Sequence, residues 1–88
     1  MPKLVITHAV QDINQWLDGK AERMALLGAA GRNVTDHVAI DGSNQAGVSL
    51  EVDDVAAVQA MIASPPPEVA EAMQKHGVMP PLTIYVEK

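Results

Sequence analysis

The chain has 88 residues, 48% of them hydrophobic, a formal net charge of −5 at pH 7 and no cysteine. This length predicts one domain over residues 1–88, whose small core leaves a thin margin of stability. The six Lys and Arg residues are scattered, which excludes a nucleic-acid surface. No apolar run reaches the ~20 residues that span a bilayer. We therefore expect no nucleic-acid or membrane partner, and the absence of Cys and of a signal-peptide pattern favours the cytoplasm.

The N-terminal third predicts a strand and then a helix. Residues 3–10 are nearly all apolar or β-branched, which is typical of a central strand. Asp12 is a suitable N-cap, with Gln15 at the capping-box spacing. We expect one helix over residues 13–27, with an apolar stripe that ends at glycines. Gly19 lies inside this helix, where glycine lowers helix stability by up to about 1 kcal/mol relative to Ala. Its presence is explained either by close approach to a strand or a ligand, or by chance.

Residues 34–52 predict a β-hairpin. Two runs rich in Val and Ile, VTDHVAI and AGVSLEV, flank the turn-forming cluster Asp41-Gly42-Ser43-Asn44. Each run alternates apolar with polar residues, so each has two distinct faces.

The C-terminal third predicts two short helices and a last strand. Asp53 or Asp54 caps a helix that cannot pass the three prolines 65–67, because proline lacks an N–H group. The break should fall between Ala63 and Glu68. A second helical piece follows over residues 68–76 and stops at Gly77, before a strand over residues 82–86.

The predicted order is strand, helix, hairpin, helix, strand. This βαββαβ order indicates an α+β, ferredoxin-like fold, in which helices cover one face of a four-stranded antiparallel sheet. Strand alternation makes one face almost wholly apolar, and we expect it under the helices: Leu4, Ile6, His8, Val38, Ile40, Val48, Leu50, Val52, Leu82, Ile84 and Val86. The mixed face is apolar at its centre and polar around it: Val5, Thr7, Ala9, Thr35, His37, Ala39, Gly47, Ser49, Glu51, Thr83 and Tyr85. A homodimer joined through the mixed face would explain both properties.

The element order, the opening ITHAVQDINQW and the segment SPPPEVAEAMQKHGV resemble a family group across the whole chain. This group is the dimeric α/β-barrel proteins of ferredoxin-like topology, which include antibiotic-biosynthesis-type monooxygenases and muconolactone isomerase-like enzymes. The resemblance implies two sheets facing each other in a dimer, with a pocket between each sheet and its helices. Haem-degrading relatives carry a His and a Trp on the later helical region. Here His76 fits that pattern, but Trp16 lies in the first helix, which argues against haem.

His8 is the candidate catalytic residue, because imidazole titrates near neutral pH and alternation places it at the rim of the space between sheet and helices. The alternative is a half-buried His that donates to a backbone carbonyl. Trp16, Met24, Met61 and Met73 point inward by periodicity. They are candidate substrate contacts, with ordinary core packing as the alternative.

Other residues favour structural roles. We expect His37 on the dimer face and His76 at a helix end, where it offsets the helix dipole. Arg23 could clamp a carboxylate, but a solvated position is the simpler expectation. The spacing of His and carboxylate residues indicates no metal, and we expect no cofactor.

Two functions follow. The first is a cofactor-independent monooxygenase- or isomerase-like enzyme, or a ligand-binding protein, with a small apolar molecule in the pocket. The second is a non-catalytic dimeric structural or regulatory module. A cavity of a few hundred Å³ beneath His8 would favour the first, and a close-packed interior would favour the second.

Overall fold

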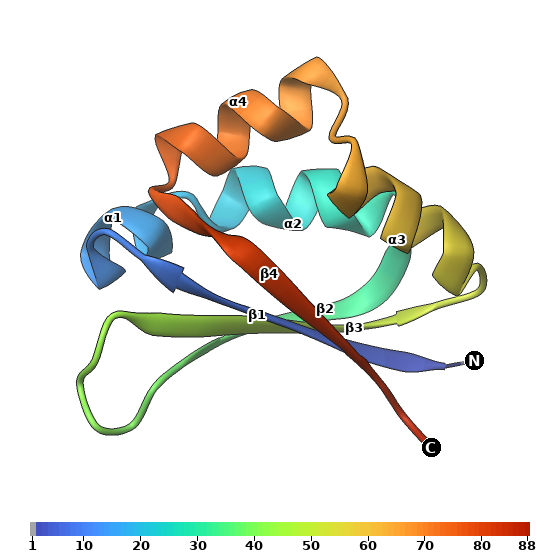
Figure 1. The fold of residues 1–88 in the computed structure, drawn as a ribbon, viewed down its shortest axis with the longest axis horizontal. Coiled ribbons are helices and arrows are strands. Elements are labelled where there is room, and N and C mark those ends of the chain that lie inside the picture. The colour runs from blue at the N-terminus through green and yellow to red at the C-terminus, as the bar shows by residue number, and fades with distance from the viewer. Residues whose placement is uncertain (1) are drawn as a thin grey trace.

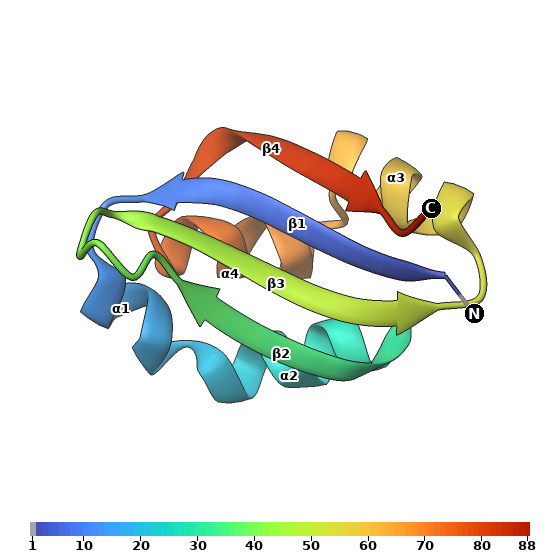
Figure 2. The ribbon, with the colours of Figure 1, turned by 90° about the horizontal axis from the view of Figure 1, so that it is seen from below.

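The computed structural model describes residues 2–88, which form a single sheet covered by helices on one face (Figure 1). The elements are β1 (Lys3–Val10), α1 (Ile13–Asp18), α2 (Lys20–Gly28), β2 (Gly31–Val38), β3 (Gln45–Val52), α3 (Val55–Ala63), α4 (Pro67–Lys75) and β4 (Val78–Val86). The strand order is β2-β3-β1-β4, and all neighbours are antiparallel. Figure 2 shows the opposite face of the sheet, which no helix covers. The ferredoxin-like α+β prediction is therefore confirmed.

The helix boundaries follow the local sequence. The carboxylate of Asp12 accepts hydrogen bonds from the first turn of α1, and that of Asp54 does the same for α3. Helix α3 ends at Ala63 and α4 begins at Pro67, so the predicted interruption by proline is confirmed. Strand β4 begins at Val78, four residues earlier than expected.

The first helical segment differs from the prediction, because it is two helices rather than one. Helices α1 and α2 meet at Gly19, whose φ of −87° and ψ of 7° leave the helical geometry. A Cβ atom added to Gly19 would collide with the imidazole of His76, at the end of α4. Glycine at this position therefore lets the end of α4 approach the junction of α1 and α2.

The core lies between the sheet and the helices, as strand alternation predicts. Its most buried side chains come from the two central strands, β1 and β3, and from α1 and α3: Leu4, Ile6, Val10, Trp16, Val48, Leu50, Val52 and Val58. Each aliphatic side chain of this kind contributes roughly 1.5–3 kcal/mol through its burial. This apolar layer fixes the position of the site described below.

Three residues predicted for the core are exposed. Val38 ends the edge strand β2, and Ile40, at 105% relative exposure, lies in the connection to β3. Figure 1 shows that this connection curves away from the helices, so nothing in the described chain covers it. Val86 ends β4 and is likewise exposed. Alternation alone does not show where along a strand the covering helices stop.

No helix within residues 2–88 is long and apolar enough to cross a membrane.

Candidate functional site

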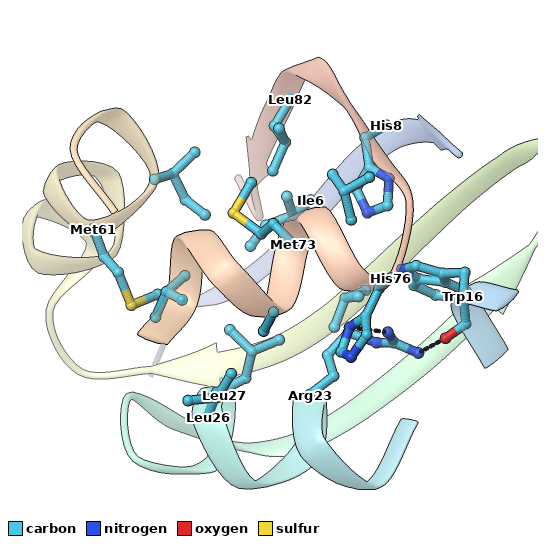
Figure 3. Close-up of a pocket in the computed structure, with 15 residues that line it drawn as sticks. Ile6, His8, Trp16, Arg23, Leu26, Leu27, Met61, Met73, His76 and Leu82 are labelled. Carbon is cyan, nitrogen blue, oxygen red and sulfur yellow. Dashed lines mark hydrogen bonds between the residues drawn. The ribbon is translucent and has the colours of Figure 1, made fainter. Parts of the chain in front are cut away.

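A small apolar cavity lies between the sheet and the helices, with a volume of about 70 Å³ (Figure 3). All four helices and strands β1, β3 and β4 contribute to its wall. Of the predicted site residues, His8, Trp16, Met61 and Met73 line it. Met24 is not among the lining residues. The structure thus brings four of the five candidates together.

His8 is buried at the inner face of β1, opposite Ala46 of β3. Its Nδ1 lies 3.1 Å from the carbonyl oxygen of Ala9. Because a carbonyl can only accept, Nδ1 carries the proton and Nε2 keeps a lone pair. No residue of the described chain makes a hydrogen bond to Nε2. Burial lowers the pKa of His8, the Ala9 bond opposes this, and the charge of Arg23 lowers it further. The imidazole is therefore a neutral base at pH 7.

Trp16 is fully buried between two polar side chains of the site. Its ring meets His8 edge to face, with 5.8 Å between ring centroids. The guanidinium carbon of Arg23 lies 3.8 Å from the indole centroid, which is a cation–π contact. The indole Nε1–H is buried and has no hydrogen-bond partner within residues 2–88.

Arg23 was expected in solvent, but it is only 8% exposed and lines the cavity. Its Nε and Nη2 donate to the two carboxylate oxygens of Asp36 at 3.1 and 2.7 Å. Nη2 also donates to the carbonyl oxygen of Trp16 at 2.9 Å. Asp36 faces inward because it shares its strand face with Val34, which packs on the core. Arg23 therefore binds a carboxylate of its own chain. The alternation of residues along β2 indicates that Asp36 faces inward, and this pattern could have identified it.

His76 caps the end of α4 as predicted, yet it is also buried and lines the cavity. Its Nδ1 accepts from Nη1 of Arg23 at 3.2 Å, and its Nε2 donates to Glu22 at 2.9 Å. Both ring nitrogens are thus engaged, and neither is a free base. Figure 3 shows His76 beside Arg23, with His8 apart from both. The close approach that Gly19 allows is what brings His76 here.

His37 lies on the uncovered face of the sheet, as predicted, and its Nε2 is 2.9 Å from the hydroxyl of Ser49. It takes no part in the cavity. No cluster of three or more His, Asp or Glu residues within the described chain is arranged to hold a metal ion.

Comparison with known proteins identifies the fold. No family model and no curated protein matches this chain. Among solved structures, a proposed antibiotic biosynthesis monooxygenase of Bordetella bronchiseptica matches with a TM-score of 0.72, 15% identity and coverage of 99% of this chain and 94% of that one. Tetracenomycin F2 cyclase from Streptomyces glaucescens, a polyketide cyclase, matches with a TM-score of 0.59, 16% identity and coverage of 92% and 79%.

A third similar structure is a dimeric protein of unknown function from Bacteroides fragilis, with a TM-score of 0.59, 12% identity and coverage of 99% and 94%. Identities this low show the fold and nothing finer. The chain therefore has the ferredoxin-like fold of the antibiotic biosynthesis monooxygenase-like structures, as the sequence resemblance implied.

Proposed function

We propose that the cavity binds a small, mainly apolar molecule and that His8 removes a proton from it. The observation that carries this proposal is a buried, neutral imidazole whose Nε2 has no partner in the described chain and which stands at the wall of an apolar cavity. A base buried in this way is suited to proton transfer near neutral pH.

The reaction that fits is proton abstraction from an acidic C–H or O–H bond. The electron pair stays on the substrate, and the proton moves to Nε2 of His8. Trp16, Met61 and Met73 supply apolar contact surface for the rest of the molecule. Proton abstraction is a step that cofactor-independent monooxygenases and isomerases share. The fold similarity to a protein described as an antibiotic biosynthesis monooxygenase supports this class.

Cavity size favours the second candidate, a non-catalytic dimeric module whose interior is filled by its own side chains. The volume of about 70 Å³ is well below the roughly 300 Å³ at which ligand pockets usually begin. Met61 and Met73 oppose this reading, because an unbranched thioether side chain adapts its shape to an occupant. Figure 3 shows both on the helices that close the cavity.

A matched pair of variants separates the two candidates. His8→Gln removes the base, whereas His37→Gln changes an exposed imidazole on the other face of the sheet. Small molecules that stabilise the parent protein in a thermal-shift screen are tested for binding and turnover. His8→Gln should lower turnover by about 10²- to 10⁴-fold while His37→Gln leaves it unchanged. If His8→Gln matches the parent on every ligand found, the non-catalytic module is the better description.

We further propose that the uncovered sheet face joins two copies of the chain. Its side chains include Val5, Ala9 and the 56% exposed Tyr85, which would otherwise stay in water. The protein from Bacteroides fragilis, which has this fold and is described as dimeric, supports a dimer. Sedimentation should give twice the chain mass of 9.3 kDa at micromolar concentration. Tyr85→Arg should shift the protein toward the monomer, and a parent protein that sediments at 9.3 kDa would contradict the proposal.

A further inference from the structure

The imidazole of His8 is held at two places by its own chain. The carbonyl oxygen of Ala9 lies 3.1 Å from Nδ1, and the indole of Trp16 meets the ring edge to face at an interplanar angle of 70°. Aromatic contacts of this kind favour one relative orientation of two rings. Within residues 2–88, Trp16 Nε1 is the one buried side-chain nitrogen or oxygen without a partner, so the unpaired Nε2 of His8 keeps accessible surface. The ring therefore presents Nε2 as its basic atom at the cavity wall.

Trp16 owes its own position to tertiary contacts. It belongs to α1, whose six residues are too few for a helix that is stable by itself. Arg23 contacts it twice: Nη2 donates to the backbone carbonyl oxygen of Trp16 at 2.9 Å, and the guanidinium carbon lies 3.8 Å from the indole centroid. Figure 3 draws the first of these contacts as a dashed line. One side chain therefore fixes both the backbone and the ring of Trp16.

Arg23 is itself held from two further elements. Its Nε and Nη2 donate to both carboxylate oxygens of Asp36 in β2, and its Nη1 donates to Nδ1 of His76 at the end of α4. The side chains of Arg23 and Asp36 are 9% and 3% exposed. A buried ion pair of this kind is typically no more stabilising than apolar side chains of the same volume. Stability alone therefore does not account for the pair, whereas the need to fix one geometry of the guanidinium does.

We propose that Arg23 is a positioning residue for His8. Through Trp16 it holds the imidazole in the orientation that keeps Nδ1 on Ala9 and Nε2 toward the cavity. Asp36 acts one step further back, because it fixes Arg23. The contacts run without a gap from β2 through α2 and α1 to β1. This inference rests on the proposed function and adds a residue that acts on the base through another side chain.

The protonation of the His8 ring gives a test that needs no ligand. ¹H–¹⁵N NMR correlations between ring nitrogens and carbon-bound ring protons distinguish the Nδ1–H from the Nε2–H tautomer, and comparison with His8→Gln assigns the signals. The parent protein should hold His8 in the Nδ1–H form at pH 7. The double variant Arg23→Met with Asp36→Leu leaves no charge buried alone, so it should fold. Its ratio of Nδ1–H to Nε2–H should fall roughly three- to tenfold, which is the effect of losing one hydrogen bond.

Arg23→Lys separates geometry from charge. Lysine keeps a cation beside Asp36 but cannot stack flat on the indole or donate along two parallel bonds. The tautomer ratio of His8 should therefore fall in Arg23→Lys as well. Lys20→Met is the matched control, because it removes an exposed cation from the same helix, α2, and should leave the ratio unchanged. Circular dichroism checks that each variant is folded. Should the double variant fail to fold, Arg23→Lys carries the test on its own.

The outcomes distinguish this inference from the proposed function. A parent-like tautomer ratio in either folded Arg23 variant would overturn the positioning role and leave His8 in place as the base. A parent protein whose His8 is in the Nε2–H form, or is protonated at pH 7, would overturn the proposed function and this inference together.

Discussion

Removing one partner of the buried Arg23–Asp36 ion pair should destabilise the protein strongly. The side chains are 9% and 3% exposed, and the carboxylate receives two hydrogen bonds from the guanidinium. Asp36→Leu leaves the Arg23 cation buried without its counter-charge, and Arg23→Met leaves the Asp36 anion in the same state. Each change should lower the free energy of unfolding by about 3–5 kcal/mol, which is typical for a broken buried pair.

The double variant Arg23→Met with Asp36→Leu should recover most of this loss. Neither charge is then buried alone, and apolar side chains of similar volume fill the space. Urea unfolding followed by circular dichroism measures all four proteins, and each single variant should move the midpoint down by about 2 M or more. The coupling energy between the two positions should exceed about 1 kcal/mol. Single variants that each cost less than about 1 kcal/mol would refute the reasoning, because such values belong to pairs screened by water.

Three further changes test other parts of the structure. Gly19→Ala should lower stability by about 1–3 kcal/mol in thermal denaturation, because the new methyl group collides with His76; Gly28→Ala, with open space around it, is the matched control and should cost nothing. Burial lowers the folded-state pKa of His8, so the unfolded chain binds more protons below about pH 6.5, and the free energy of unfolding should fall as the pH drops toward 5. The free energy of unfolding of His8→Gln should depend less steeply on pH. An unchanged slope would contradict the lowered pKa of His8. Asp54→Ala removes the N-cap of α3 and should cost about 1 kcal/mol in urea unfolding, whereas a neutral result would mean that the cap is replaced by water.

The order of elements and the facing of the central strands could be predicted from the sequence, because they depend on local features. Alternating apolar residues in β1 and β3 specify their inner face, Asp12 and Asp54 cap helices in the turn that follows them, and proline interrupts a helix wherever it stands. For the same reason His8 and Trp16 could be placed on the inner side of the molecule from the sequence, and the structure has them there.

The polar half of the site depends on contacts between residues far apart in the chain, so only the tertiary structure shows it. Arg23 and Asp36 belong to different elements, and their pairing requires the exact position of α2 over β2. His76 reaches Arg23 because α1 and α2 separate at Gly19. The local sequence does not distinguish this break from a glycine that only destabilises a continuous helix. Periodicity shows which way a side chain points, whereas the packing of whole elements determines which partner it meets and which N–H group of the cavity is left unpaired.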